Sequence, residues 1–351
     1  MRPGILLDVR NLTKHFPVRS GPFQRQSGTV RAVTDVSFQL SEGESLSLVG
    51  ESGCGKTTLA RTLLRGYEAT AGSAWFRTEE DKAFDLLKLP RRRLKPLRRQ
   101  LQMIFQDPYS SLNPRMTVQQ IIGEPLRIHA GELGVPTREG RRERVRELLL
   151  QVGLRPEAAR RYPHAFSGGE RQRIGIARTL ATRPRLVVAD EPVSALDVSV
   201  QAQILNLMLE LQNRYRIGML LLTHNLMVVR HVSDRVAVMY LGRIMETAPT
   251  ETLFTSPGHP YTAALLDAIP RPDPRVRNRS RIKLGGVVPS PRNPPSGCPF
   301  HPRCVHARDR CRNDLPELEQ IASGHQVRCH LWRELDLNGA AAFSRRTPVD
   351  Q

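Results

Sequence analysis

Short apolar runs and helically spaced apolar residues divide the chain into predicted strands and helices. Runs of four or five mostly apolar residues, bounded by polar ones, are typical of strands buried on both faces of a sheet. The short runs that predict buried strands are 45–49, 186–189, 219–222 and 236–239. Segments 5–10 and 33–40 predict two more strands, on either side of a Gly/Ser/Gln-rich loop at 21–28.

Apolar residues at helical spacing predict helices between these strands. Residues 117–182 have a mainly helical pattern, and 58–64 predicts a helix directly after the strand at 45–49. Strand, helix and strand in this order predict an α/β fold with a mostly parallel sheet covered by helices. Two apolar helix faces are clear: Val145, Leu148, Leu149 and Val152, and then Ile204, Leu207, Met208 and Leu211.

The composition is strongly basic. The 351 residues suffice for one large or two modest domains, and they include 53 Lys and Arg against 34 Asp and Glu, a formal net charge of +19. Such a charge suits polyanions, either nucleic acid or the anionic face of a membrane. Arg greatly outnumbers Lys, which biased genomic composition also produces, so charge alone leaves the partner open. The basic run at 91–99 is most simply a solvated face, with lipid headgroups as the alternative contact.

No apolar run approaches the roughly 20 residues that a membrane-spanning helix needs. The first residues also lack the apolar core of a secretion signal. We therefore expect a cytosolic protein, or one that lies peripherally on a membrane. In that compartment the five cysteines are better explained as metal ligands or core residues than as disulfides.

Residues 50–58 form the most informative motif of the chain. Their sequence, Gly-Glu-Ser-Gly-Cys-Gly-Lys-Thr-Thr, fits G-x-x-x-x-G-K-[ST] between a predicted strand and a predicted helix. Glycines let the backbone N–H groups point inward, and the helix dipole adds to them, so the loop suits a polyphosphate. We expect Lys56 to reach the β- and γ-phosphates and Thr57 to ligate Mg²⁺. The residues expected to bind a nucleoside triphosphate here are Gly50, Glu51, Ser52, Gly53, Cys54, Gly55, Lys56, Thr57 and Thr58.

Two adjacent carboxylates end the predicted strand at 186–189. Asp190 is suitably placed to help hold Mg²⁺, as the second metal-organising element of a phosphate loop protein does. Glu191, one residue further, could orient and deprotonate an attacking water. The pair therefore predicts hydrolysis of the bound nucleotide.

Five further motifs follow one another along the chain. Phe16 follows Asn-Leu-Thr-Lys-His, Gln106 lies in Phe-Gln-Asp-Pro, and His224 lies in Leu-Thr-His-Asn. The other two are Ser167-Gly-Gly-Glu170 and Ser194-Ala-Leu-Asp197. Taken in order along the chain, from Phe16 to His224, they resemble the adenine-stacking aromatic, Q-loop, signature, D-loop and switch histidine of ATP-binding-cassette (ABC) ATPases, over roughly residues 5–270.

The resemblance implies both the fold and the roles of these residues. It implies a P-loop NTPase domain at 1–270, with a mostly parallel core sheet, an antiparallel β subdomain and a helical subdomain at about 107–182. A linker and a small C-terminal extension would occupy 271–351. Two such subunits would bind ATP between them, head to tail. The implied catalytic residues are Lys56, Gln106, Glu191 and His224; the implied Mg²⁺ ligands are Thr57, Gln106 and Asp190; and Ser167, Gly168, Gly169, Glu170 and Asp197 would act at the partner's ATP.

Glu170 departs from the pattern, because the family more often has Gln at the end of the signature. A carboxylate near a triphosphate is unfavourable unless a neighbouring guanidinium, such as that of Arg171 or Arg173, offsets it. We therefore expect Glu170→Gln to keep or mildly raise the rate of ATP hydrolysis.

Four cysteines lie close together in the sequence of the extension. The gaps between Cys298, Cys304, Cys311 and Cys329 are five, six and seventeen residues, without the C-x₂-C pair of a zinc ribbon. Four thiolates gathered by loops suit an iron–sulfur cluster. Zinc, with or without His301 or His330, and unliganded thiols remain as alternatives. The segment also resembles the C-terminal extension of ABC ATPases from dipeptide and oligopeptide importers, which can carry a [4Fe–4S] cluster.

The importer resemblance sets the expected partners and location. It is closer to the second, F-type ATPase subunit of the importer than to the first. It implies a second ABC ATPase in a heterodimer, two transmembrane permease subunits and, indirectly, a substrate-binding protein. The chain would lie peripherally at the cytoplasmic face of the cell membrane, without touching the cargo. Related importers of nickel or other small solutes share this core and remain an alternative.

A nucleic-acid or ribosome-associated ABC ATPase is a different class of function that the basic charge would suit. Such relatives usually carry two cassettes in one chain or a cassette split by a long coiled coil. This chain has one uninterrupted cassette, which argues against nucleic acid as a partner. A redox-sensing role of the cysteines could accompany transport.

Overall fold

The computed structural model describes residues 4–20, 25–269 and 285–337. Much of the linker that the sequence predicts from residue 271 lies outside these residues.

A large, mainly parallel sheet forms the centre of the molecule. Its strand order is β11-β12-β10-β9-β3-β8-β7-β6. The pairs among β9, β3, β8, β7 and β6 are parallel, whereas β10, β12 and β11 pair antiparallel. The strands are β3 (Ser45–Val49), β6 (Leu101–Ile104), β7 (Leu186–Asp190), β8 (Gly218–Thr223), β9 (Arg235–Tyr240), β10 (Arg243–Pro249), β11 (Glu319–Ala322) and β12 (His325–Val327).

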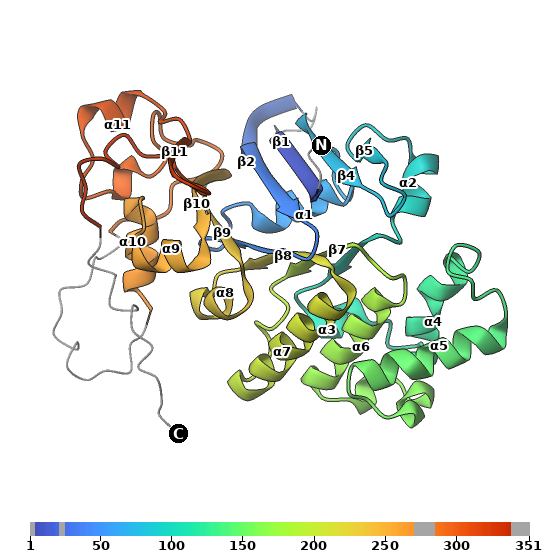
Figure 1. Cartoon of the computed structure of the whole chain (residues 1–351). Helices are drawn as coiled ribbons and strands as arrows, with labels where there is room; N and C mark the ends of the chain where they lie inside the picture. The colour runs from blue at the N-terminus through green and yellow to red at the C-terminus, as the bar shows by residue number, and fades with distance from the viewer. Residues whose placement is uncertain (1–3, 21–24, 270–284, 338–351) are drawn as a thin grey trace, which may run out of the picture.

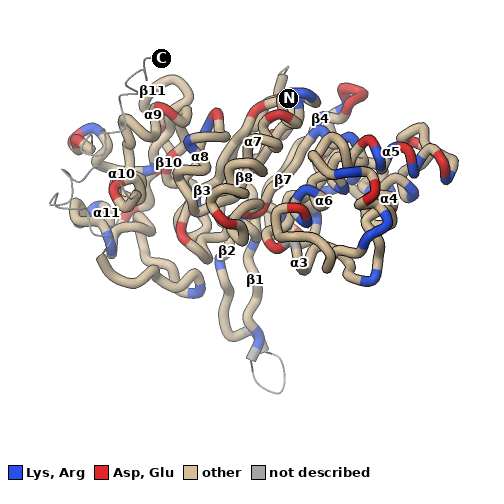
Figure 2. The backbone as a smooth tube through the Cα atoms, turned by 90° about the horizontal axis from the view of Figure 1, so that it is seen from below, with Lys and Arg blue, Asp and Glu red and all other residues tan. Residues whose placement is uncertain are grey.

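A second, antiparallel sheet covers part of this one. Its order is β2-β1-β4-β5, with β1 (Ile5–Ser20), β2 (Arg25–Ser41), β4 (Ala71–Arg77) and β5 (Ala83–Asp85). The predicted loop at 21–28 is wrong in part: β2 begins at Arg25, because the ladder with β1 continues as far as Ser20↔Arg25. The apolar pattern predicts strands that are too short here, because the polar outer half of the hairpin buries no apolar face. Figure 2 shows it extending away from the body of the molecule.

Helices cover the sheet and build a separate lobe (Figure 1). The lobe contains α3 (Pro108–Ser111), α4 (Val118–Ile128), α5 (Arg138–Gln151) and α6 (Gly168–Leu180). The other helices are α1 (Lys56–Leu63), α2 (Arg91–Leu97), α7 (Val198–Tyr215), α8 (Leu226–Val232), α9 (Thr250–Thr255), α10 (Pro260–Asp267) and α11 (Asp309–Asn313), with 3₁₀ turns at Pro156–Arg160, Pro163–Ala165 and His301–Arg303. None of the helices in the described ranges is long and apolar enough to span a bilayer.

Both faces of the parallel strands are buried, as their continuous apolar runs predict. Along β7, Val187 and Ala189 pack into the core shared with the helical lobe. Leu186 and Val188 face the opposite core, shared with α1 and the antiparallel sheet. The two predicted helix faces, on α5 and α7, are buried against the first of these cores. The expected α/β fold is therefore confirmed.

The basic run at 91–99 lies only partly in solvent. It forms α2, in which Leu94 is buried, and ends at Arg99, which is buried and ion-paired with Glu79. Elsewhere, charges of both signs are frequent on α4, α5 and α6 in Figure 2.

The C-terminal segment is hydrogen-bonded into the large sheet rather than suspended from it. Strand β12 pairs with β10 through Glu246↔Val327 and Thr247↔Gln326. The fully buried Glu246 carboxylate accepts hydrogen bonds from the backbone N–H groups of Gly258 and His259, at 2.6 and 3.0 Å, and contacts His325 Nε2 at 2.8 Å. Because an unpaired buried carboxylate is costly, these contacts fix β10, β12 and the start of α10 together.

Helix α6 begins at a capping box formed by Ser167 and Glu170. The Ser167 hydroxyl accepts from the Glu170 N–H at 3.3 Å, and the Glu170 carboxylate accepts from the Ser167 N–H at 2.9 Å. In the described contacts neither neighbouring guanidinium pairs with this carboxylate: Arg171 donates to the Pro163 carbonyl and Arg173 to that of Val152. The carboxylate is instead used to begin the helix.

We expect Glu170→Gln to preserve this cap, because a Gln amide oxygen can also accept from the Ser167 N–H. Glu170→Ala should lower the free energy of unfolding by about 0.5–1 kcal/mol, as loss of helix caps does. Urea unfolding of both variants measures the difference. Equal losses for Gln and Ala would contradict the assigned hydrogen bond.

The buried His259 should make the fold sensitive to acid. Burial lowers its pKa to about 3, and its Nδ1 accepts from the Tyr261 N–H at 3.0 Å, which requires a neutral ring. In the unfolded chain His259 takes up a proton below its ordinary pKa near 6.5, whereas in the folded chain it stays neutral down to about pH 3. The free energy of unfolding is therefore fully present above pH 6.5 and falls as the pH drops from there towards 3. The loss approaches about 1.4 kcal/mol per pH unit.

We expect His259→Asn, which can still accept from Tyr261, to reduce this pH dependence. Urea unfolding at several pH values between 7.5 and 4.5 measures it. If the free energy of unfolding falls equally with pH in the variant and in the unmodified chain, His259 is not the group whose protonation on unfolding causes the loss.

Candidate functional site

The predicted catalytic and Mg²⁺-binding residues meet at the carboxyl edge of the parallel strands. The phosphate loop follows β3, Gln106 follows β6, Asp190 and Glu191 end β7, and His224 follows β8. Parallel neighbours end at the same edge, so chain segments more than 100 residues apart converge there. Figure 1 shows two of these strands, β7 and β8, side by side under α1.

The phosphate loop curls tightly at two glycines. Gly55 has φ +109°, and a Cβ added there would lie 2.1 Å from the Ala32 carbonyl oxygen. A Cβ on Gly50 would lie 2.2 Å from the carbonyl oxygen of Met239. Lys56 is buried, and its Nζ donates to the carbonyl oxygens of Gly50 at 2.7 Å and Glu51 at 3.1 Å. The loop is thus closed by its own lysine, whose charge is directed into the curl.

Thr57 and Asp190 are adjacent, as a shared metal site requires. The Thr57 hydroxyl donates to the Asp190 carboxylate at 3.1 Å. Burial raises the pKa of Asp190 above its ordinary value, and the nearby Glu191 adds to the rise. A buried carboxylate beside a hydroxyl is a hard oxygen donor set that a cation would stabilise, so these residues fit Mg²⁺.

Glu191 lies between Gln106 and His224, two of the other predicted catalytic residues. One carboxylate oxygen accepts from the Gln106 side-chain amide at 3.1 Å, and the other lies 2.9 Å from His224 Nδ1. An ionised carboxylate only accepts, so this contact places the imidazole proton on Nδ1. The Glu191 backbone has φ +46°, which is uncommon for a residue with a side chain.

A pocket of about 430 Å³ opens over the phosphate loop. Phe16, with Lys14 Nζ 4.6 Å from its ring centroid, lines one wall. Pro291, from the C-terminal segment, lines another, and its carbonyl accepts from the Arg31 N–H at 2.9 Å. The remaining lining residues are Val30, Ala32, Ser52, Gly53, Gly55, Lys56, Thr57, Thr58, Gln106 and Glu191. Sequence reasoning missed Val30, Ala32 and Pro291, since none carries a chemical signal and only the fold brings them here.

The signature residues and Asp197 do not line this pocket within the described part of the chain. Ser167 begins α6, and a Cβ on Gly169 would meet a methyl group of Val200 at 2.5 Å, so α6 packs closely on the start of α7. Asp197 begins α7, and its carboxylate accepts from Ser199 Oγ at 2.6 Å, which holds the pKa of Asp197 below its ordinary value. These residues form a second surface, separate from the chain's own phosphate loop.

The four C-terminal cysteines gather in one place without forming a ready metal site. All are free thiols, and Cys298, Cys311 and Cys329 are buried in one apolar cluster against which Cys304 packs. Burial raises the pKa of Cys298 to about 11 and that of Cys329 to about 12, and nearby thiols add to both shifts. Over the described residues, no three His, Cys, Asp or Glu side chains are arranged to hold a metal ion. The four cysteines are thus close together, as a cluster site requires, but their side chains are not arranged as metal ligands.

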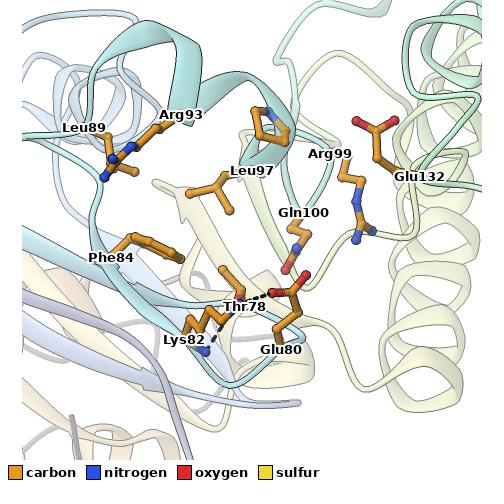
Figure 3. A pocket seen from close by; sticks show the side chains of 11 residues that line it. Thr78, Glu80, Lys82, Phe84, Leu89, Arg93, Leu97, Arg99, Gln100 and Glu132 are labelled. Atoms are coloured by element: carbon orange, nitrogen blue, oxygen red, sulfur yellow. Dashed lines mark hydrogen bonds and ion pairs between the residues drawn. The ribbon is translucent and has the colours of Figure 1, made fainter.

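A separate pocket of about 400 Å³ lies beside α2 (Figure 3). Phe84, Leu89 and Leu97 form its apolar part, and Arg99, Gln100 and Glu132 its polar part. It shares no lining residue with the pocket over the phosphate loop.

Comparison with known proteins agrees with this geometry. The family model described as ABC transporter matches residues 33–194, and the model for the oligopeptide/dipeptide transporter C-terminal region matches 245–311. The oligopeptide transport ATP-binding protein AppF of Bacillus subtilis is 51% identical over 93% of this chain and 97% of its own length. The di/tripeptide transport ATP-binding protein DppF of Pseudomonas aeruginosa is 49% identical over 93% of this chain and 97% of its own length.

Solved structures show the same fold in the nucleotide-binding part. One of them is the ATP-binding cassette MJ0796, in a dimeric post-hydrolysis state bound to ADP and Pi. The match covers 70% of this chain and 99% of the MJ0796 chain, at 26% sequence identity and with a TM-score of 0.60. The chain therefore belongs to the ABC transporter family, among the ATP-binding proteins that carry the oligopeptide/dipeptide transporter C-terminal region.

Proposed function

We propose that this chain is the ATP-hydrolysing, energy-coupling subunit of a membrane importer for dipeptides and oligopeptides. The observation that carries the proposal is the position of Glu191, held by Gln106 and His224 at the pocket over the phosphate loop. A carboxylate fixed beside a polyphosphate site can accept a proton from an attacking water, which is the chemistry that ATP hydrolysis requires.

Each residue has a distinct task in this proposal. The loop N–H groups and Lys56 bind the β- and γ-phosphates, and Phe16 stacks on the base. Thr57, Asp190 and Gln106 would hold Mg²⁺, which would neutralise charge on the phosphate oxygens. Glu191 accepts the proton from water, and His224 orients the water and the γ-phosphate through its Nε2, because its Nδ1 contacts Glu191.

The separate position of the signature surface supports a composite site. Ser167, Gly168, Gly169, Glu170 and Asp197 lie outside the chain's own pocket, so we propose that they contact the ATP of a second ABC ATPase, head to tail. The assembly would include two permease subunits and receive cargo from a substrate-binding protein. It would place this chain at the cytoplasmic face of the membrane.

The cargo is inferred from the C-terminal part of the chain. The match at residues 245–311 and the names of the relatives AppF and DppF support peptides over the alternative of nickel or another small solute. A nucleic-acid role has no comparable support.

We expect Glu191→Gln to lower the peptide-stimulated ATPase rate of the reconstituted transporter by about a hundredfold or more, because the proton acceptor is lost. ATP should still bind, since the loop is unchanged. The measurement compares ATP hydrolysis in vesicles holding the complete transporter, with and without binding protein and dipeptides or oligopeptides.

The matched control is Glu210→Gln, an exposed glutamate on α7. Full activity of Glu191→Gln would exclude the proton-acceptor role. Stimulation by nickel or another solute, but not by peptides, would overturn the cargo assignment and leave the ATPase intact. Glu170→Gln in the same assay should keep or mildly raise the rate, and a tenfold loss would give its carboxylate a role beyond the helix cap.

We propose separately that Cys298, Cys304, Cys311 and Cys329 bind one iron–sulfur cluster in the cell. Their gathering in one buried cluster supports this, and metal binding would convert the raised-pKa thiols to thiolates. Protein purified without oxygen should contain iron and sulfide and absorb visible light, and Cys311→Ser should lose both. Cys54→Ser, outside the cluster, is the control; zinc instead of iron, or no metal, would overturn the proposal.

A further inference from the structure

An arginine of the C-terminal segment forms a bidentate ion pair with the phosphate loop. Arg303 Nη1 and Nη2 donate to the two carboxylate oxygens of Glu51 at 2.6 and 3.0 Å, although the residues are 252 positions apart. The Arg303 side chain is only 5% exposed and that of Glu51 25%. Parallel hydrogen bonds of this kind, shielded from water, hold both partners in one geometry.

Arg303 is itself held on all sides. Its Nε donates to the Gly285 carbonyl at 3.1 Å, and its Nη1 lies 3.4 Å from the Tyr240 hydroxyl. It ends the 3₁₀ turn His301–Arg303, in which the Arg303 N–H donates to the carbonyl of Phe300 at 3.0 Å. The guanidinium therefore reaches the loop from a turn that has little freedom to move.

Every polar group of Glu51 has a partner in this arrangement. The carboxylate pairs with Arg303, the N–H donates to the Tyr261 hydroxyl at 3.1 Å, and the carbonyl accepts from Lys56. Tyr261 packs against Phe300, next to the turn, with ring centroids 5.2 Å apart. The contacts from Arg303 and Tyr261 thus come from segments beyond the catalytic strands. When Lys56 turns to bound phosphates, these two remain.

We propose that Arg303 is a positioning residue for the phosphate loop, through which the C-terminal segment sets the affinity for ATP. A free carboxylate in a loop that binds a polyphosphate repels the ligand. Arg303 neutralises this charge and directs it away from the pocket, while fixing the second residue of the loop. The proposal rests on the proposed function only in taking ATP as the ligand of the loop.

The turn also links the loop to the cysteines. The His301 N–H donates to the Cys298 carbonyl at 3.0 Å, and the Cys304 N–H donates to the His301 carbonyl at 3.3 Å. Arg303 therefore lies between two of the four thiols, so a rearrangement of residues 298–304 changes the position of its guanidinium relative to Glu51.

The test is the dissociation constant for Mg-ATP of the purified full-length chain, measured by equilibrium binding of a fluorescent ATP analogue. Arg303→Gln should weaken binding by about tenfold, within the range of coupling between linked sites. Adding Glu51→Gln to Arg303→Gln should recover most of this loss, because the repelling carboxylate is removed. Arg303→Lys should weaken binding less than Arg303→Gln does, because Lys keeps the positive charge but cannot form the bidentate pair of hydrogen bonds.

Arg308→Gln is the matched control, because Arg308 lies in the same segment and forms an exposed ion pair with Glu334. It should bind ATP like the unmodified chain. Equal affinity for Arg303→Gln and the unmodified chain would overturn the proposal. So would a double variant as weak as Arg303→Gln, because that result would assign Arg303 only to folding. If Arg303→Gln does not fold, the comparison of Arg303→Lys, alone and combined with Glu51→Gln, decides in the same way. Failure of the unmodified chain to bind ATP would instead refute the proposed function itself.

Discussion

The parallel pairing of β3, β8, β7 and β6 is the constraint on which the site depends. Parallel strands end at the same edge, and here four of them deliver a loop, an amide, two carboxylates and an imidazole to one place. The burial of both sheet faces fixes the register: a shift of β7 by one residue would exchange the residues facing the two cores and move Asp190 away from Thr57.

The C-terminal segment depends on a second constraint, the buried carboxylate of Glu246. Its contacts with His325 and with two backbone N–H groups tie β12 and the start of α10 to β10. In this arrangement the Tyr261 hydroxyl, Pro291 and Arg303 all lie at the phosphate loop or at the pocket over it. The segment therefore lines the pocket over the phosphate loop and contacts the loop itself, although 245–311 and 33–194 match two separate family models.

The sequence located the residues that meet at the carboxyl edge of the sheet better than it located their surroundings. Catalytic chemistry requires particular residue types at short spacings, so the phosphate loop, Asp190, Glu191 and the signature could be located from the chain alone. The strands with both faces apolar were found for a similar reason. The outer half of the β1–β2 hairpin was missed because it buries no apolar face, and Arg303 was missed because nothing in its local sequence refers to a residue 252 positions away. The cysteine spacing predicted that the thiols lie together, but not whether they are arranged as ligands.

The adjacent carboxylates Asp190 and Glu191 show how one backbone turn separates two chemical tasks. Asp190 is the last residue of β7 and remains buried beside Thr57, where burial raises its pKa. Glu191 leaves the strand with a left-handed backbone, while its N–H donates to the Leu222 carbonyl of β8 at 2.8 Å. That hydrogen bond offsets the strain and directs the side chain towards Gln106 and His224 rather than into the sheet. In the proposed mechanism, the strained residue is therefore the one whose side chain reaches the ligand, and its neighbour in regular strand geometry would hold the cation.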